Sequence, residues 1–174
     1  AAVFISDRSS LEGISFGDSK SMGEKRREEL FKMFLLSPGI EWGTGFASSK
    51  VVDRINVLEA TKVAMRKALL NLKRKGVTAD ALLIDGNFLL ATDLFEKAVI
   101  RGDETIASCK IAGIVAKVTR DRTMRRNSKR YPGYRFERHK GYGTALHLEA
   151  IERLGHCPIH RTTFVVNKSR RRGS

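Results

Sequence analysis

The chain has 174 residues, of which 41% are hydrophobic, and a formal net charge of +14. This length and composition exclude a disordered chain and favour one domain with a sizeable core. No stretch approaches the roughly 18 consecutive apolar residues that cross a bilayer, and Ala1 opens directly on an apolar segment without a secretory leader. We therefore expect an intracellular, cytoplasmic monomer, with an organelle as the alternative compartment.

The positive charge is concentrated in the C-terminal part of the chain. From Lys117 onward there are 16 basic and 4 acidic residues, whereas residues 1–116 carry 17 and 15. A basic half joined to a near-neutral half is typical of a protein that holds a polyanion on one face, and nucleic acid is the commonest such polyanion. An acidic membrane surface or ribosomal RNA would attract the same charge, so charge alone leaves the partner open.

Short apolar runs alternate with amphipathic segments, an order typical of an α/β domain. In chain order we expect a strand at 1–5, a helix at 21–36, a strand at 40–47, a helix at 51–75, strands at 81–84 and 98–100, and helices at 105–127 and 144–154. Ser21 provides the capping box of the first helix, and Gly76 ends the second. Pro132-Gly133 breaks the chain, and residues 135–144 read as a loop.

Two aspartates directly follow short apolar strands. Asp85 ends a continuous apolar run typical of a buried parallel strand, and Asp103 follows Gly102 after the next run. Ligands of open α/β sheets bind outside the carboxyl ends of the strands, and paired carboxylates are hard oxygen ligands for Mg²⁺ or Mn²⁺. Taken singly, Asp85 reads better as a turn residue and Asp103 as a helix N-cap, so spacing alone leaves a metal site open.

Seven short motifs then occur in an order and spacing that resemble ribonuclease HII, the bacterial-type ribonuclease H of type 2. They are Asp18-Ser19-Lys20, INVLEAT at 55–61, LLIDGN at 82–87, GDETIAS at 102–108, IVAKVTRD at 114–121, HKGYGT at 139–144 and CPIHR at 157–161. The resemblance covers about residues 18–164. It implies an RNase H-like α/β fold, a mixed sheet flanked by helices with a C-terminal helical segment, formed by a domain at 1–164, and leaves a basic disordered tail at 165–174.

The resemblance also implies an activity and a substrate. The expected reaction is endonucleolytic hydrolysis of RNA in RNA–DNA hybrids, with cleavage on the 5′ side of ribonucleotides embedded in duplex DNA and two Mg²⁺ or Mn²⁺ ions as cofactors. The biological task would be the removal of misincorporated ribonucleotides and of RNA primers during DNA replication and repair. The alternative is a non-catalytic module that binds RNA–DNA hybrids with the same fold.

Residue roles follow from the matched motifs. Asp85 would be a direct metal ligand, and Asp103 would hold the second metal ion or the attacking water. Tyr142 resembles the ring that packs on a deoxyribose beside the ribonucleotide, and Lys20 resembles a contact to a backbone phosphate. Ser108 and Lys117 have supporting or phosphate-binding roles.

Roles for the basic residues of the C-terminal part of the chain are predicted from their charge. Arg122, Arg126 and Lys140 are predicted to contact phosphates, and a solvated helix face is the alternative for the two arginines. Asp121 lies between Arg120 and Arg122 inside the predicted helix, so we interpret it as a structural ion-pair residue.

One family motif has no counterpart in these residues. The family's first two metal-binding carboxylates lie in an Asp-Glu-x-Gly-Arg-Gly segment on a strand that precedes the strand at 1–5, and its Gly-Arg-Gly loop reads the 2′-hydroxyl of the ribonucleotide. We interpret the sequence as lacking this first strand through truncation, which would leave it inactive as given. A catalytically dead relative is the alternative.

The cysteines and histidines are assigned no catalytic role. Cys109 and Cys157 are expected to be buried, reduced thiols, because two cysteines are too few for a disulfide framework. A zinc site at residues 156–160 lacks a second ligand pair at the usual spacing. His139 reads as a loop residue and His147 as a residue on a helix face.

Overall fold

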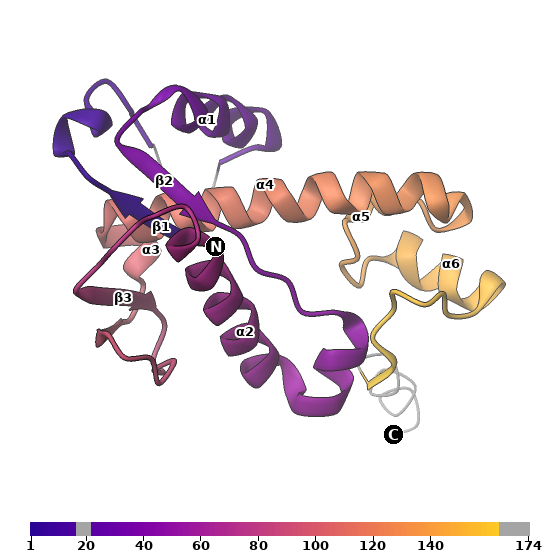
Figure 1. The fold of residues 1–174 in the computed structure, drawn as a ribbon. Coiled ribbons are helices and arrows are strands. Elements are labelled where there is room, and N and C mark those ends of the chain that lie inside the picture. Colours follow the sequence, from indigo (N-terminus) through magenta and orange to yellow (C-terminus); the bar gives the residue numbers. More distant parts are fainter. Residues whose placement is uncertain (17–21, 164–174) are drawn as a thin grey trace. The chain divides into compact units, whose positions relative to one another are not determined.

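The structure, a computed structural model, describes residues 1–16 and 22–163 (Figure 1). The chain divides into two compact units, which are described separately. The N-terminal unit comprises Ala1–Phe46 and Lys62–Thr119, and the C-terminal unit comprises Ala47–Thr61 and Arg120–Ser174. Lys20 and the predicted tail at 165–174 lie outside the described residues, and the single domain at 1–164 stays a prediction.

Four strands of the N-terminal unit form two pairs. β1 (Ala2–Ile5) pairs antiparallel with β2 (Ile40–Gly43), and β3 (Ala81–Asp85) pairs parallel with β4 (Phe95–Val99). Figure 1 shows β1 and β2 running side by side. Together with the helices around them, these antiparallel and parallel pairs confirm the predicted mixed α/β class.

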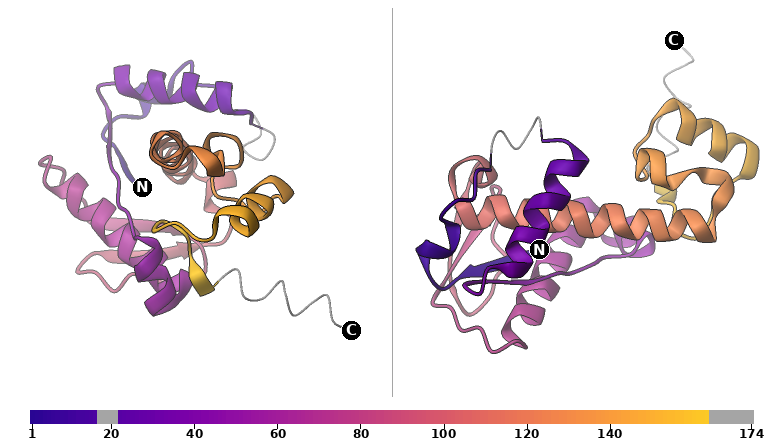
Figure 2. Two further views of the ribbon diagram at one scale, coloured as in Figure 1. Left: turned by 90° about the vertical axis from the view of Figure 1, so that its right-hand side faces the viewer. Right: turned by 90° about the horizontal axis from the view of Figure 1, so that it is seen from above.

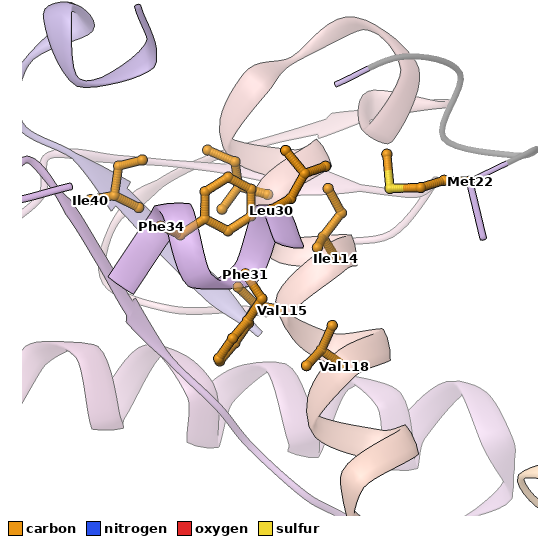
Figure 3. Close-up of a cluster of buried hydrophobic side chains, with 9 residues drawn as sticks. Met22, Leu30, Phe31, Phe34, Ile40, Ile114, Val115 and Val118 are labelled. Atoms are coloured by element: carbon orange, nitrogen blue, oxygen red, sulfur yellow. The ribbon is translucent and has the colours of Figure 1, made fainter. Parts of the chain in front are cut away.

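The core of the N-terminal unit lies between two helices. α1 (Glu24–Leu36) lies against the first half of α4 (Ala107–Arg130) in both views of Figure 2. α1 buries Leu30, Phe31 and Phe34, and α4 buries residues spaced three and four apart, as expected for one face of a helix. The contributors from α4 are Ile111, Ile114, Val115 and Val118, and Figure 3 shows the cluster. Their burial is the main source of stability in this unit.

Two predicted boundaries in this unit are wrong. The N-cap of α1 is Gly23 and not Ser21, which lies outside the described residues. β2 ends at Gly43 and not at residue 47, because the following segment runs against the backbone of α2 (Ser49–Lys73). A Cβ atom placed on Gly45 would lie 1.9 Å from the carbonyl oxygen of Ala64, so the close approach requires glycine.

Gly45→Ala is expected to destabilise the N-terminal unit by about 2–3 kcal/mol, because the new methyl group displaces the α2 backbone. The matched control is Gly113→Ala in α4, where an added Cβ meets nothing within 4 Å. That control is expected to stabilise the protein by about 0.5–1 kcal/mol, since alanine favours the helix interior. Urea unfolding followed by Trp42 fluorescence measures both, and an equal effect of the two variants would contradict the packing described here.

The second half of the N-terminal unit also differs from expectation. β3 was predicted to be a buried strand, but only Ile84 is buried and Leu83 is 43% exposed. The reason is that, among the described residues, β3 has a single strand neighbour, β4. The expected strand at 98–100 begins earlier, at Phe95, and Ile100 lies outside it.

The long helices are interrupted. α2 begins at Ser49 and contains a break at Asn56, whose φ of 68° lies in the left-handed region. The helix predicted at 105–127 is two helices, α3 (Gly102–Thr105) and α4, separated by the extended residue Ile106. Over residues 1–16 and 22–163, no helix is both long enough and apolar enough to span a bilayer.

The C-terminal unit is helical, as the predicted C-terminal segment requires. After α4 come the turn η2 (Pro132–Tyr134), α5 (Phe136–His139) and α6 (Ala145–Leu154), which is capped by Thr144. α5 lies in the segment that was predicted to be a loop. A short helical turn, η1 (Arg8–Leu11) in the N-terminal unit, was also not expected. The core of the C-terminal unit is small and aromatic, with Tyr134 stacked on Phe136 at 5.4 Å between ring centroids.

Candidate active site and nucleic-acid interface

Asp85 and Asp103 meet at the carboxyl end of the parallel β3–β4 pair. Asp85 is the last residue of β3 and pairs with Val99 of β4. The chain then turns at Arg101, whose φ is 59°, into α3. This turn brings the Gly102 N–H to Asp85, where it donates a hydrogen bond of 2.8 Å to Oδ1. Asp103, the next residue, therefore begins α3 beside the Asp85 carboxylate.

The Cys109 thiol in α4 lies close enough to both carboxylates for their charges to affect its pKa. Burial, followed by the negative charges of Asp85 and Asp103, raises the pKa of Cys109 above its usual value. A Cβ atom on Gly102 would lie 3.3 Å from the Cys109 sulfur and 3.5 Å from Cα and Cβ of Asp85, so the three residues are tightly packed. Cys109 is thus a buried, free thiol, as predicted, and lies close to Gly102 at this edge of the sheet.

The two alternative roles, a turn residue for Asp85 and a helix N-cap for Asp103, differ from what is observed. The N-cap of α3 is Arg101 and not Asp103, which lies within the first turn. Asp85 bonds to a residue 17 positions away rather than within its own turn.

The donor set fits part of a site for a hard divalent cation. Asp85 is exposed, Asp103 is half-buried, and neither forms an ion pair with any described residue. Carboxylate oxygens of this kind suit Mg²⁺ or Mn²⁺. Within residues 1–16 and 22–163 no group of three or more acidic, histidine or cysteine side chains is placed to hold a metal ion, so the assignment of Asp85 and Asp103 as ligands stays a prediction.

Tyr142 presents its ring to solvent in the C-terminal unit, where it is 56% exposed. The guanidinium of Arg120 lies over the ring, 4.7 Å from its centroid, and donates a hydrogen bond of 2.5 Å to the hydroxyl. Arg120 in turn donates to Oδ1 of Asp121 through Nε at 3.1 Å and Nη2 at 2.8 Å. The prediction that Asp121 is a structural ion-pair residue is confirmed, and its side chain is buried.

The other predicted contacts are distributed along the chain. Arg122 and Arg126 are exposed in the second half of α4, where Arg126 donates to the Thr123 hydroxyl at 3.2 Å. Lys117 is exposed in the first half of α4, and Ser108 hydrogen bonds to the Cys109 thiol. Lys140 is the C-cap residue of α5, and its ammonium donates to the carbonyl of Glu137 in that helix.

Three buried histidines pack around the core of the C-terminal unit, and they were missed as a group. His139 stacks on His147 at 4.2 Å between ring centroids, and Nε2 of His147 lies 3.0 Å from Nε2 of His160. His139 is the last residue of α5, so the prediction of a loop residue is wrong, whereas His147 lies on a helix, α6, as predicted, and is buried there. The segments on either side of α6 carry His139 and His160, and both rings pack against His147 of α6. No periodic pattern signals such packing.

Burial disfavours the charged forms of two of these histidines, His147 and His160. Burial lowers the pKa of His147, with the charges of His139 and His156 adding to the effect against a hydrogen bond to the Tyr142 carbonyl. Burial is also the main cause of the lowered pKa of His160. Because the unfolded chain has ordinary histidines, it binds protons near pH 6.5 that the folded unit does not bind.

The C-terminal unit is therefore expected to lose about 1–2 kcal/mol of unfolding free energy per pH unit as the pH falls below about 6.5, until the lowered pKa values of His147 and His160 are reached. All three tyrosines lie in this unit and Trp42 lies in the other, so near-UV circular dichroism of tyrosine and Trp42 fluorescence separate the two. Tyrosine signals that persist until carboxylates protonate, near pH 4, would contradict this expectation.

Comparison with known proteins identifies the family. The model of the ribonuclease HII family matches residues 1–167. The chain belongs to the ribonuclease HII family. Its α/β fold is accordingly the RNase H-like fold expected from the motifs, and the family is one of endoribonucleases of the ribonuclease H type.

Curated relatives agree with this assignment. Ribonuclease HII of Acetivibrio thermocellus is 43% identical over 167 residues, which cover 96% of this chain and 63% of that protein. Ribonuclease HII of Caldicellulosiruptor bescii is 40% identical over a match that covers 96% of this chain and 78% of that protein. Ribonuclease HII of Geobacter metallireducens is 44% identical over a match that covers 94% of this chain and 74% of that protein. The chain thus spans under two thirds of the first of these ribonucleases HII.

Proposed function

We propose that the protein hydrolyses RNA within RNA–DNA duplexes, cutting on the 5′ side of ribonucleotides embedded in DNA and leaving a 3′-hydroxyl. The observation that carries this proposal is the convergence of Asp85 and Asp103 at the carboxyl end of the parallel β3–β4 pair. There the Gly102 N–H donates a hydrogen bond of 2.8 Å to Oδ1 of Asp85, and the charges of both carboxylates help to raise the pKa of the Cys109 thiol. A carboxyl edge of this kind is where α/β sheets place their ligands.

The two aspartates have different roles in the proposal. Asp85 is fixed through Oδ1 by Gly102 and offers its other oxygen as a direct ligand. Asp103, half-buried on the first turn of α3, orients the attacking water or a second ion. Two bound Mg²⁺ or Mn²⁺ ions would supply activation of that water and stabilisation of the leaving oxygen. Ser108 supports the site through its hydrogen bond to Cys109.

The nucleic acid is proposed to be held by charge and by one ring. Arg122, Arg126 and Lys117 are exposed on α4, and with Lys20 and Lys140 they contact phosphates without reading sequence. Tyr142, with more than half its surface exposed, packs on the deoxyribose beside the ribonucleotide. Binding is expected to weaken steeply with salt, because each neutralised phosphate releases counterions.

A duplex assay tests the proposal against its rival, a hybrid-binding module that does not cleave. The substrate is a DNA duplex with one ribonucleotide, the control is the same duplex without it, and each is incubated with Mg²⁺, Mn²⁺ or a chelator. Two proteins are compared: the 174-residue chain, and the same chain with a strand carrying Asp-Glu-x-Gly-Arg-Gly joined before Ala1. Metal-dependent cleavage 5′ of the ribonucleotide by either protein supports the proposal. Selective binding without cleavage by both supports the rival, and no selectivity at all contradicts both.

A further inference from the structure

Tyr142 is the most constrained exposed aromatic residue in the C-terminal unit. Its ring is covered on one side by the Arg120 guanidinium at 4.7 Å, and its hydroxyl accepts a hydrogen bond from the same group. Arg120 has little freedom of its own, because two of its nitrogens donate to Oδ1 of Asp121. Asp121 is 3% exposed, so its position is set by the packing of α4. The ring of Tyr142 is therefore fixed to a rigid helix through a single side chain.

The backbone of Tyr142 is fixed from a different direction. Nδ1 of His160 lies 2.9 Å from the Cys157 N–H nitrogen and 3.2 Å from the Cys157 carbonyl oxygen; in the tautomer that makes the shorter contact, Nδ1 accepts and the proton is on Nε2. That nitrogen lies 3.0 Å from Nε2 of His147, which therefore accepts and carries its own proton on Nδ1. Nδ1 of His147 then donates to the Tyr142 carbonyl at 2.9 Å. The relay runs in one direction, from Cys157 to Tyr142, and every polar atom in it is satisfied.

Charge separates Arg120 from its neighbours on α4. The positive charge of Arg120 is balanced by the adjacent Asp121 carboxylate at 2.8 Å, whereas Arg126 donates to the neutral hydroxyl of Thr123. Although burial lowers it, hydrogen bonds to Asp121 and Tyr142 raise the pKa of Arg120 above its usual value, so the group stays a cation and a donor. A guanidinium already paired in this way releases few counterions on binding a phosphate.

The geometry points to Arg120 and His147 as positioning residues that preset Tyr142 for one sugar of the duplex, Arg120 through the ring and His147 through the backbone. The inference rests on the proposed function, because it assigns to Tyr142 the contact with the deoxyribose next to the ribonucleotide. Because the ring is held on two sides, it loses little conformational freedom on binding. It stays at a fixed distance from the neighbouring sugar, and this distance is what discriminates a deoxyribose from a ribose. Neither positioning residue touches the nucleic acid itself.

The test measures selectivity for the RNA-to-DNA junction. Fluorescence anisotropy gives the affinity of the full chain for two duplexes, one with a deoxyribose and one with a ribose next to the ribonucleotide. Tyr142→Ala, Arg120→Met and Arg120→Lys are each expected to lower the affinity ratio of the two duplexes by about tenfold, and the Tyr142→Ala, Arg120→Met double variant no further than the single variants. Additive losses would overturn the inference, as would wild-type selectivity in Arg120→Lys.

Salt dependence separates positioning from a direct phosphate contact. Arg120→Met is expected to leave the slope of log affinity against log salt unchanged, whereas Arg126→Met lowers it by about 0.9. A slope that falls equally in the two variants would make Arg120 a phosphate contact and overturn the inference. If Tyr142→Ala itself leaves selectivity unchanged, the role of Tyr142 in the proposed function fails, which is a different result from additivity.

The histidine relay has its own matched pair of variants. His147→Asn keeps an N–H donor near the position of Nδ1, and His147→Gln moves the donor to the position of Nε2. Selectivity is expected to persist in His147→Asn and to fall by about tenfold in His147→Gln, while near-UV tyrosine signals confirm that both variants are folded. Equal selectivity in the two folded variants would remove His147 from the inference.

Discussion

Asp85→Asn is expected to reduce cleavage of the ribonucleotide-containing duplex by at least about 100-fold, beyond the 10–100-fold that outer-shell partners of metal ligands contribute. The amide keeps an oxygen that accepts the hydrogen bond from the Gly102 N–H at 2.8 Å, so the turn into α3 persists. What is lost is the negative charge and the second carboxylate oxygen, on which metal binding depends. The rate is measured in the form of the chain that cleaves in the duplex assay.

The matched control is Asp80→Asn, at the opposite end of the same strand. Asp80 is exposed and precedes β3, and its backbone carbonyl, which the substitution leaves intact, accepts a hydrogen bond from the Phe95 N–H. Its rate is expected to stay within about twofold of the parent, as for surface substitutions away from special features. Equal losses in Asp80→Asn and Asp85→Asn, or full activity in Asp85→Asn, would exclude Asp85 as the ligand.

Phe34→Ala is expected to cost about 3–5 kcal/mol of unfolding free energy, as for other fully buried aromatic residues. Phe34 has no exposed surface and packs in the cluster that joins α1 to α4. The loss is a large share of the roughly 5–15 kcal/mol that stabilises a typical domain. Urea unfolding monitored by Trp42, whose ring lies 5.6 Å from that of Phe31 in the same unit, measures it.

Phe46→Ala is the control for this prediction. The Phe46 ring is 69% exposed, and only its backbone carbonyl makes a hydrogen bond, from the Lys67 ammonium at 3.2 Å. Its truncation is expected to change the free energy by about 0.5 kcal/mol or less. If the two variants unfold at the same urea concentration, the α1–α4 cluster is not the core of the N-terminal unit.

The presence of the main strands and helices was predictable because it depends on local pattern, whereas several of their ends were not. The apolar run that ends at Asp85 predicted β3 and the position of its carboxylate, whereas the buried face of α4 became visible only in the structure. The exposure of Leu83 was not predictable, since it depends on which strands pair with β3. The break in α2 at Asn56 was not predicted either, because the apolar pattern of the helix continues across it.

The site divides in the same way. Asp85 and Asp103 were found by their position after apolar strands, but their convergence depends on the left-handed turn at Arg101, which no local pattern marks. Arg120 was visible only as a neighbour of Asp121, and its contact with Tyr142 joins residues 22 positions apart. The buried histidines look like ordinary surface residues in the sequence, because their burial depends on how the segments that flank α6 pack against it.

Binding of Mn²⁺ followed by NMR tests most directly the claim that Asp85 and Asp103 form one divalent-ion site. Paramagnetic Mn²⁺ added to the ¹⁵N-labelled 174-residue chain is expected to broaden first the amide signals of Asp85, Gly102, Asp103 and Cys109, and this broadening should disappear in Asp85→Asn and persist in Asp80→Asn. Broadening that begins at other acidic residues, or that is unchanged in Asp85→Asn, would contradict the site described here.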